Sequence, residues 1–218
     1  MGCVSIENPV RRTDERMVPL EEIKKISEYC KANKIGLHLD GARLYMASAW
    51  SGVSIKEYAS YFDTVYISLY KYLGASGGAI LCGDKNVIDK MPHLIKIHGG
   101  NQFGNWLNAA MAVHRLEGME DRLQQAITRF KEIMNSINQL PGFKISALDG
   151  GTNIYAMQLP ASIVINKFGE TMGQKYFIRL SPPDSKGNWK ITVNETLLYR
   201  DTSFIVNAFK ESVKLASS

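Results

Sequence analysis

Two short apolar stretches decide the fold, IGLHLD at residues 35–40 and TVYISL at residues 64–69. Both are rich in the apolar, β-branched and aromatic side chains that are typical of buried strands. The first ends in Asp40, and Lys71 follows two positions after the second. Segments with helical periodicity lie before and between these strands. Because strands that alternate with helices form parallel sheets, residues 4–91 predict an α/β layer with largely parallel strands.

Further elements are expected on both sides of these stretches. In the first part the expected strands are 4–7 and 79–82, and the expected helices are 19–33, 42–50 and 84–91. The second part has a different order, with helices expected at 104–117, 123–137, 161–168 and 201–215 and strands at 143–146, 153–159, 176–181 and 189–193. Such an order is typical of a small α+β domain. We therefore expect a partial large domain at 1–118 and a small C-terminal domain at 119–218.

Composition excludes several classes of protein. The 218 residues carry a formal charge of +5, but Lys and Arg alternate with acids, so no basic stripe for nucleic acid is present. No apolar run approaches the roughly 18 residues of a membrane span, and the N-terminus does not read as a secretory signal. Cys3, Cys30 and Cys82 are widely spaced and predict buried free thiols in a cytoplasmic protein. No Cys or His spacing indicates zinc.

Asp40 and Lys71 form the chemically informative pair. Parallel sheets bind ligands beyond the carboxyl ends of their strands, where both residues fall. A lysine alone in a loop is usually structural or solvated, and an acid at a strand end often only caps the next helix. Together they match pyridoxal chemistry, which needs an amine for a Schiff base and an anion at the ring nitrogen.

The motifs around this pair are similar to those of a known family. HLDGARLY at 38–45 and SLYKYLGASGGAILCG at 68–83 closely resemble the threonine aldolase and β-eliminating lyase family of fold-type-I pyridoxal-phosphate enzymes. ENPV at 7–10 and the segment 18–43 resemble the strand, loop and helix that precede them. The resemblance covers residues 4–118 well and implies a PLP-transferase-like large domain without its N-terminal half.

The resemblance implies a role for each residue of the motifs. Lys71 would hold the cofactor as a Schiff base, and Asp40 would pair with the pyridine nitrogen. Ala42 would pack against the ring, and Arg43 would contact the cofactor or the substrate carboxylate. Ser68 would hold the cofactor phosphate or hydroxyl, unless it only caps the strand end.

A further cation for the substrate carboxylate is expected on a late strand. Arg179 suits the chemistry, because a guanidinium grips a carboxylate with two parallel hydrogen bonds, whereas Lys190 suits the position, and both stay open. The chain also departs from the family. Tyr70 stands where a serine is usual, and the stretch after the next helix lacks an arginine, so that Lys96 or His98 could hold a phosphate across a dimer interface.

The implied reaction is cleavage of threonine or allo-threonine to glycine and an aldehyde. The alternatives are another β-eliminating lyase or aminotransferase, and a non-catalytic truncated paralogue that acts only in assembly. The glycine-rich turn that binds the cofactor phosphate is expected in an absent N-terminal half. We therefore expect this chain to pair with that half or to form a homo-oligomer.

Overall fold

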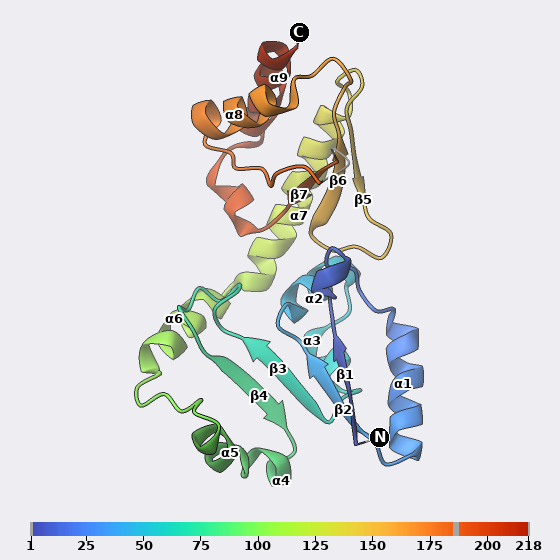
Figure 1. Cartoon of the computed structure of the whole chain (residues 1–218), viewed down its shortest axis with the longest axis vertical. Coiled ribbons are helices and arrows are strands. Elements are labelled where there is room, and N and C mark those ends of the chain that lie inside the picture. The colour runs from blue at the N-terminus through green and yellow to red at the C-terminus, as the bar shows by residue number, and fades with distance from the viewer. Residues whose placement is uncertain (1, 185–187, 218) are drawn as a thin grey trace. The chain divides into compact units, whose positions relative to one another are not determined.

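The computed structural model describes residues 2–184 and 188–217. The chain divides into two compact units, Met1–Glu120 and Asp121–Ser218, each with its own sheet (Figure 1). Within the described residues no helix combines the length and the apolar character needed to cross a bilayer.

The first unit is built on a four-stranded sheet. Its strands are β1 (Cys3–Glu7), β2 (Gly36–Asp40), β3 (Thr64–Ser68) and β4 (Ala79–Gly83), in the order β1-β2-β3-β4. The first three strands are parallel and β4 is antiparallel to β3. The predicted α/β layer with a mostly parallel sheet is therefore confirmed.

Three helices close the core of this unit. They are α1 (Leu20–Ala32), α2 (Leu44–Ser51) and α3 (Ile55–Ala59). One buried cluster joins them to the sheet, with Ile23 from α1, Leu44 from α2, Tyr58 from α3 and Leu39 and Val65 from the central strands. Burial of these apolar side chains fixes β2 and β3 side by side, and so fixes the strand ends that carry the candidate site.

The helical segment after β4 differs from the prediction. The single helix expected at 84–91 is two helices, α4 (Lys85–Ile88) and α5 (Met91–Ile97). Pro92 explains the break, since proline lacks an N–H and fits the first turn of a helix better than its interior. The next helix, α6 (Trp106–Leu116), lies within the predicted range and exposes several large apolar side chains, with Trp106 75% exposed.

The second unit packs three helices with an antiparallel sheet. The long helix α7 (Met119–Ile137) leads into it, and its strands are β5 (Lys144–Ala147), β6 (Ile154–Gln158) and β7 (Trp189–Thr192), in the order β5-β6-β7. The helices α8 (Ile165–Tyr176) and α9 (Thr202–Ala216) follow β6 and β7. Phe168 centres an aromatic core, with its ring 6.0 Å from those of both Trp189 and Phe209.

One element predicted in the second unit is wrong, and a second begins later than predicted. The strand expected at 176–181 is absent, because Phe177 takes a left-handed backbone (φ 56°) that ends α8, and residues 177–181 form no regular element. The helix expected at 161–168 begins only at Ile165. The residues before it turn at Pro160, and Ile163 forms an antiparallel bridge with Ser217.

The three cysteines are free, as predicted, but only Cys30 is buried. Cys3 and Cys82 are exposed, because β1 and β4 are the two edge strands of the first sheet. The apolar pattern around them indicates strands correctly and does not show which strands lie at an edge.

Candidate active site

Asp40 and Lys71 lie at the same edge of the first sheet. Asp40 is the last residue of β2, and Lys71 lies in the loop that follows β3. The register pairs Glu7 with Asp40 and Asp40 with Tyr66, so these three residues form one row across the carboxyl ends of the strands. This edge is where a parallel sheet binds ligands.

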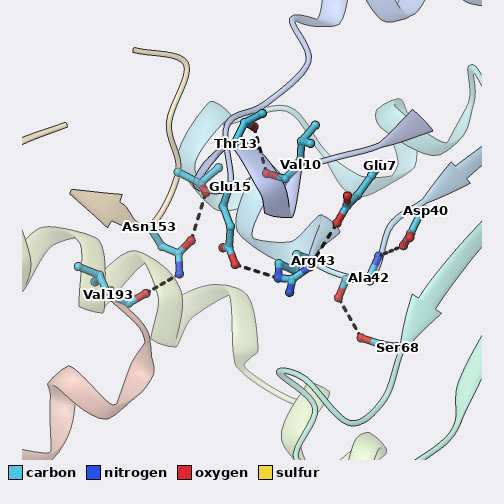
Figure 2. A network of polar contacts seen from close by, with 11 residues as sticks. Glu7, Val10, Thr13, Glu15, Asp40, Ala42, Arg43, Ser68, Asn153 and Val193 are labelled. Carbon is cyan, nitrogen blue, oxygen red and sulfur yellow. Dashed lines mark hydrogen bonds and ion pairs between the residues drawn. The ribbon is translucent and has the colours of Figure 1, made fainter. Parts of the chain in front are cut away.

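The turn after Asp40 is fixed by close contacts. The Ala42 N–H donates a hydrogen bond of 3.1 Å to Oδ1 of Asp40. Gly41 allows this turn to approach β3, because a Cβ at this position would lie 2.9 Å from the carbonyl oxygen of Tyr66. Ser68 is buried and donates a hydrogen bond of 2.9 Å to the Ala42 carbonyl (Figure 2). Its hydroxyl hydrogen is therefore already bonded within the protein. This favours the alternative in which Ser68 only caps the end of the strand.

Lys71 lies in a loop closed by the backbone. The Leu69 N–H donates to the Gly78 carbonyl at 3.0 Å, and both Gly74 and Gly78 have positive φ angles that suit glycine. Lys71 is half-buried, and its Nζ lies 5.5 Å from the centre of the Tyr70 ring. Among the described residues no carboxylate forms an ion pair with Lys71, so its amine is not committed to a structural salt bridge.

Arg43 contacts two carboxylates. Its Nε is 2.8 Å from Oε1 of Glu15 and its Nη1 is 3.4 Å from Oε1 of Glu7 (Figure 2). The side chain of Arg43 is only 12% exposed. Burial raises the pKa of Glu15, while the charge of Arg43 and a hydrogen bond from Tyr72 act in the opposite direction. The sequence did not indicate Glu15, because nothing in its local pattern marks the turn that carries it inward.

Asn8 is a second residue that the sequence reading missed. It is completely buried, its N–H donates to the Asp40 carbonyl at 3.1 Å, and its Oδ1 accepts from the Val18 N–H at 2.9 Å. Its Nδ2 has no hydrogen-bond partner among the described residues. A buried donor without an acceptor is costly, and next to a strand-end acid it suits a bound ligand that carries an acceptor.

Tyr66 adds a polar group beside Asp40. Burial raises its pKa to about 12, with further contributions from a hydrogen bond with Tyr70 and from the charges of Tyr70 and Asp40. Its phenol therefore stays protonated and remains able to donate a hydrogen bond at neutral pH.

The second unit contains the other predicted cations. Arg179 and Lys190 both line a pocket of about 650 Å³, together with Arg200, which the sequence reading missed. Among the described residues that line the pocket none is acidic. Apolar side chains, among them Phe130, Ile133 and Phe209, also line it. This pocket of the second unit suits a ligand with an anionic group. Lys96 and His98 lie at the end of α5 and are exposed, and their role in holding a phosphate stays a prediction.

The sequence of residues 1–159 matches the β-eliminating lyase family. The chain belongs to that family. The family includes the threonine aldolases and uses pyridoxal phosphate. The residues at the strand ends fit this cofactor, since they provide an uncommitted amine on Lys71, a carboxylate on Asp40 and an unsatisfied donor on Asn8.

Two curated relatives match this family member over different lengths of sequence. The low-specificity L-threonine aldolase of Candida albicans is 39% identical over 179 residues, which are 81% of this chain and 46% of the relative. The alanine racemase TOXG of Cochliobolus carbonum is 40% identical over 110 residues, which are 50% of this chain and 28% of that protein. The chain thus spans about half the length or less of these curated relatives.

A solved structure confirms the fold over nearly the whole chain. The structure, from Exiguobacterium, is assigned to the aromatic amino acid β-eliminating lyases and threonine aldolases, and matches with a TM-score of 0.80 at 25% identity. The match covers 98% of this chain and 62% of the Exiguobacterium chain. Both units of the family member therefore have counterparts in one larger protein.

Proposed function

We propose that this chain provides the lysine-bearing part of an aldolase that cleaves threonine or allo-threonine to glycine and an aldehyde. One observation carries the proposal: Asp40 ends β2 beside β3, and the loop after β3 holds Lys71 free of any ion pair with the described residues. The choice among reactions rests on the relatives named low-specificity threonine aldolases.

Each residue at the strand ends has a separate role in the proposed reaction. Pyridoxal phosphate, when bound, supplies an electron sink for the carbanion that remains when the Cα–Cβ bond breaks. The Lys71 amine is the group that would hold the cofactor carbonyl carbon. The Asp40 carboxylate would pair with the ring nitrogen and favour its protonated form, and the hydrogen bond from the Ala42 N–H orients that carboxylate. Ala42 is 5% exposed, and its methyl group would be the apolar contact for the face of the ring.

A borohydride experiment tests the cofactor assignment directly. Purified chain is mixed with pyridoxal phosphate, reduced with borohydride and digested, and the modified peptide is mapped by mass spectrometry. We expect the adduct on Lys71 and its loss in Lys71→Ala. Lys85→Ala is the matched control, because Lys85 is an exposed lysine on α4. Its removal should leave the yield of the Lys71 adduct unchanged. An equal yield of adduct in Lys71→Ala would contradict the assignment.

A product assay then separates the aldolase from its alternatives. Glycine and acetaldehyde released from threonine support the aldolase. The similarity to TOXG, which is named an alanine racemase and is 40% identical over 110 residues, supports racemisation as the second candidate. Exchange of the α-hydrogen of alanine without glycine release would support that candidate.

Pairing with further chain is part of the proposal. Both β1 and β4 lie at open edges of the first sheet, and β4 is exposed along most of its length. Unpaired strand edges add strands from other segments readily. We propose that a polypeptide equivalent to the part of the relatives that this chain does not span, or a second copy of the chain, covers this unit. A chain that assembles with another chain but stays inactive with cofactor would support the non-catalytic alternative.

A further inference from the structure

The loop between β1 and α1 is shaped to carry Glu15 inward. Val10 and Arg16 form an antiparallel bridge across it, and the Glu15 N–H donates to the Val10 carbonyl at 3.0 Å. Asp14 and Glu15 have φ angles of 59° and 56°, a left-handed conformation that few residues other than glycine adopt. Backbone strain of this kind persists where the surrounding structure demands it.

The inward position has an electrostatic cost. Glu15 is 8% exposed, and burial raises the pKa of its carboxyl group, so its charged form is disfavoured there despite the nearby Arg43 and Tyr72. Glu7 contributes a second negative charge on the same guanidinium. Arg43 therefore faces one carboxylate more than its charge requires, and Glu15 is the one held by the strained loop.

We propose that Glu15 occupies the carboxylate-binding edge of Arg43 and competes there with the carboxylate of the amino-acid substrate. The proposal rests on the proposed function, in which Arg43 meets the cofactor or the substrate. A guanidinium grips a carboxylate through two neighbouring N–H groups, and here Glu15 takes Nε while Glu7 contacts Nη1 (Figure 2). These two contacts lie on different edges of the guanidinium, since Nε pairs with Nη2 on one edge and Nη1 pairs with Nη2 on the other. A carboxylate that binds through the Nε edge must therefore displace Glu15.

The competition makes Glu15 a residue that sets substrate affinity, with no part in the chemical step. Glu15 contacts Arg43 at the shorter distance, 2.8 Å against 3.4 Å for Glu7, so its removal should release more of the guanidinium. Tyr72 follows Lys71 directly and also bonds to Glu15. Displacement of Glu15 would therefore break its hydrogen bond with Tyr72 in the loop that carries Lys71.

Three variants separate competition from structure. Glu15→Gln keeps the size of the side chain and removes its charge. Glu15→Gly removes the side chain and suits the left-handed backbone, so it serves if Glu15→Gln folds poorly. Asp14→Gly is the matched control, because it relaxes the neighbouring left-handed residue and leaves both carboxylates on Arg43.

The readout is the Nε–Hε signal of Arg43 in ¹⁵N NMR spectra of the full chain without cofactor, assigned by its loss in Arg43→Lys. Acetate is the minimal carboxylate probe, L-threonine the substrate, and methylammonium the control without a carboxylate. We expect acetate and threonine to half-saturate the Arg43 signal at about tenfold lower concentration in Glu15→Gln than in wild type, the effect of one hydrogen bond between charged groups.

Three results would overturn the inference. Equal half-saturation in wild type and Glu15→Gln, or an effect of Asp14→Gly as large as that of Glu15→Gln, would show that Glu15 only supports the loop. If neither acetate nor threonine changes the Arg43 signal in any variant, Arg43 does not bind carboxylates. These outcomes leave the cofactor assignment intact, because the borohydride adduct on Lys71 does not depend on Glu15.

Discussion

Asp40 on β2 and Tyr66 on β3 are register partners, so the carboxylate expected at the cofactor ring and a half-buried phenol lie side by side. Burial, a hydrogen bond with Tyr70 and the charges of Tyr70 and Asp40 together raise the pKa of Tyr66 to about 12. Each of these groups disfavours the phenolate. The pair thus links a candidate catalytic acid to a group with its own optical signal.

The first prediction concerns this phenol. The difference in tyrosinate absorbance between wild type and Tyr66→Phe should stay near zero through the ordinary tyrosine value of about 10 and appear only toward pH 12. Asp40→Asn should lower the pKa of Tyr66, because it removes a negative charge that opposes ionisation. A Tyr66 signal that titrates near 10 in wild type would contradict the raised pKa, and an unchanged pKa in Asp40→Asn would show that the two groups do not interact.

The second prediction concerns Gly41. Gly41→Ala should destabilise the chain by about 1–3 kcal/mol, because the added methyl carbon would lie 2.9 Å from the backbone oxygen of Tyr66 and must push β2 from β3. Urea unfolding measures the effect. Gly77→Ala is the control, since a Cβ there meets no atom within 4 Å. Equal stability of the two variants would contradict the close approach of the strands.

The third prediction is a pH dependence. The raised pKa of Glu15 means that the folded chain binds a proton here more tightly than the unfolded chain. The resulting contribution to stability is complete below the ordinary value of 4.5 and is lost as pH rises through the folded pKa. Wild type should therefore lose stability relative to Glu15→Gln over that range in urea unfolding. Glu28→Gln, on the exposed surface of α1, should show no such trend, and parallel curves for wild type and Glu15→Gln would refute the shift.

The fourth prediction ranks the cations of the second unit. Arg179→Ala should raise KM for threonine about tenfold in the active protein and change kcat little, because a guanidinium provides two parallel hydrogen bonds to a carboxylate. Lys190→Ala should have a smaller effect on KM. Arg179 and Lys190 line the same pocket, so the comparison is matched. The reverse order would assign the carboxylate to Lys190.

The sequence predicted the strands that end at Asp40 and precede Lys71, because buried strands have a plain apolar signature. It did not predict the contacts of Arg43, since the turn that delivers Glu15 is left-handed at Asp14 and Glu15 without any glycine to mark it. The strand wrongly expected at 176–181 failed for the same reason, at Phe177. Left-handed backbone at ordinary residues depends on tertiary contacts that local pattern does not contain.

The exposed face of α6 gives the chain a built-in optical sensor. Of the three tryptophans, Trp106 is 75% exposed, Trp50 is half-buried and Trp189 is buried in the core of the second unit. Indole fluorescence shifts to shorter wavelength when a solvated ring becomes covered. A titration with any polypeptide that covers α6 can therefore be followed at the native Trp106, with Trp106→Phe as the blank and no attached dye.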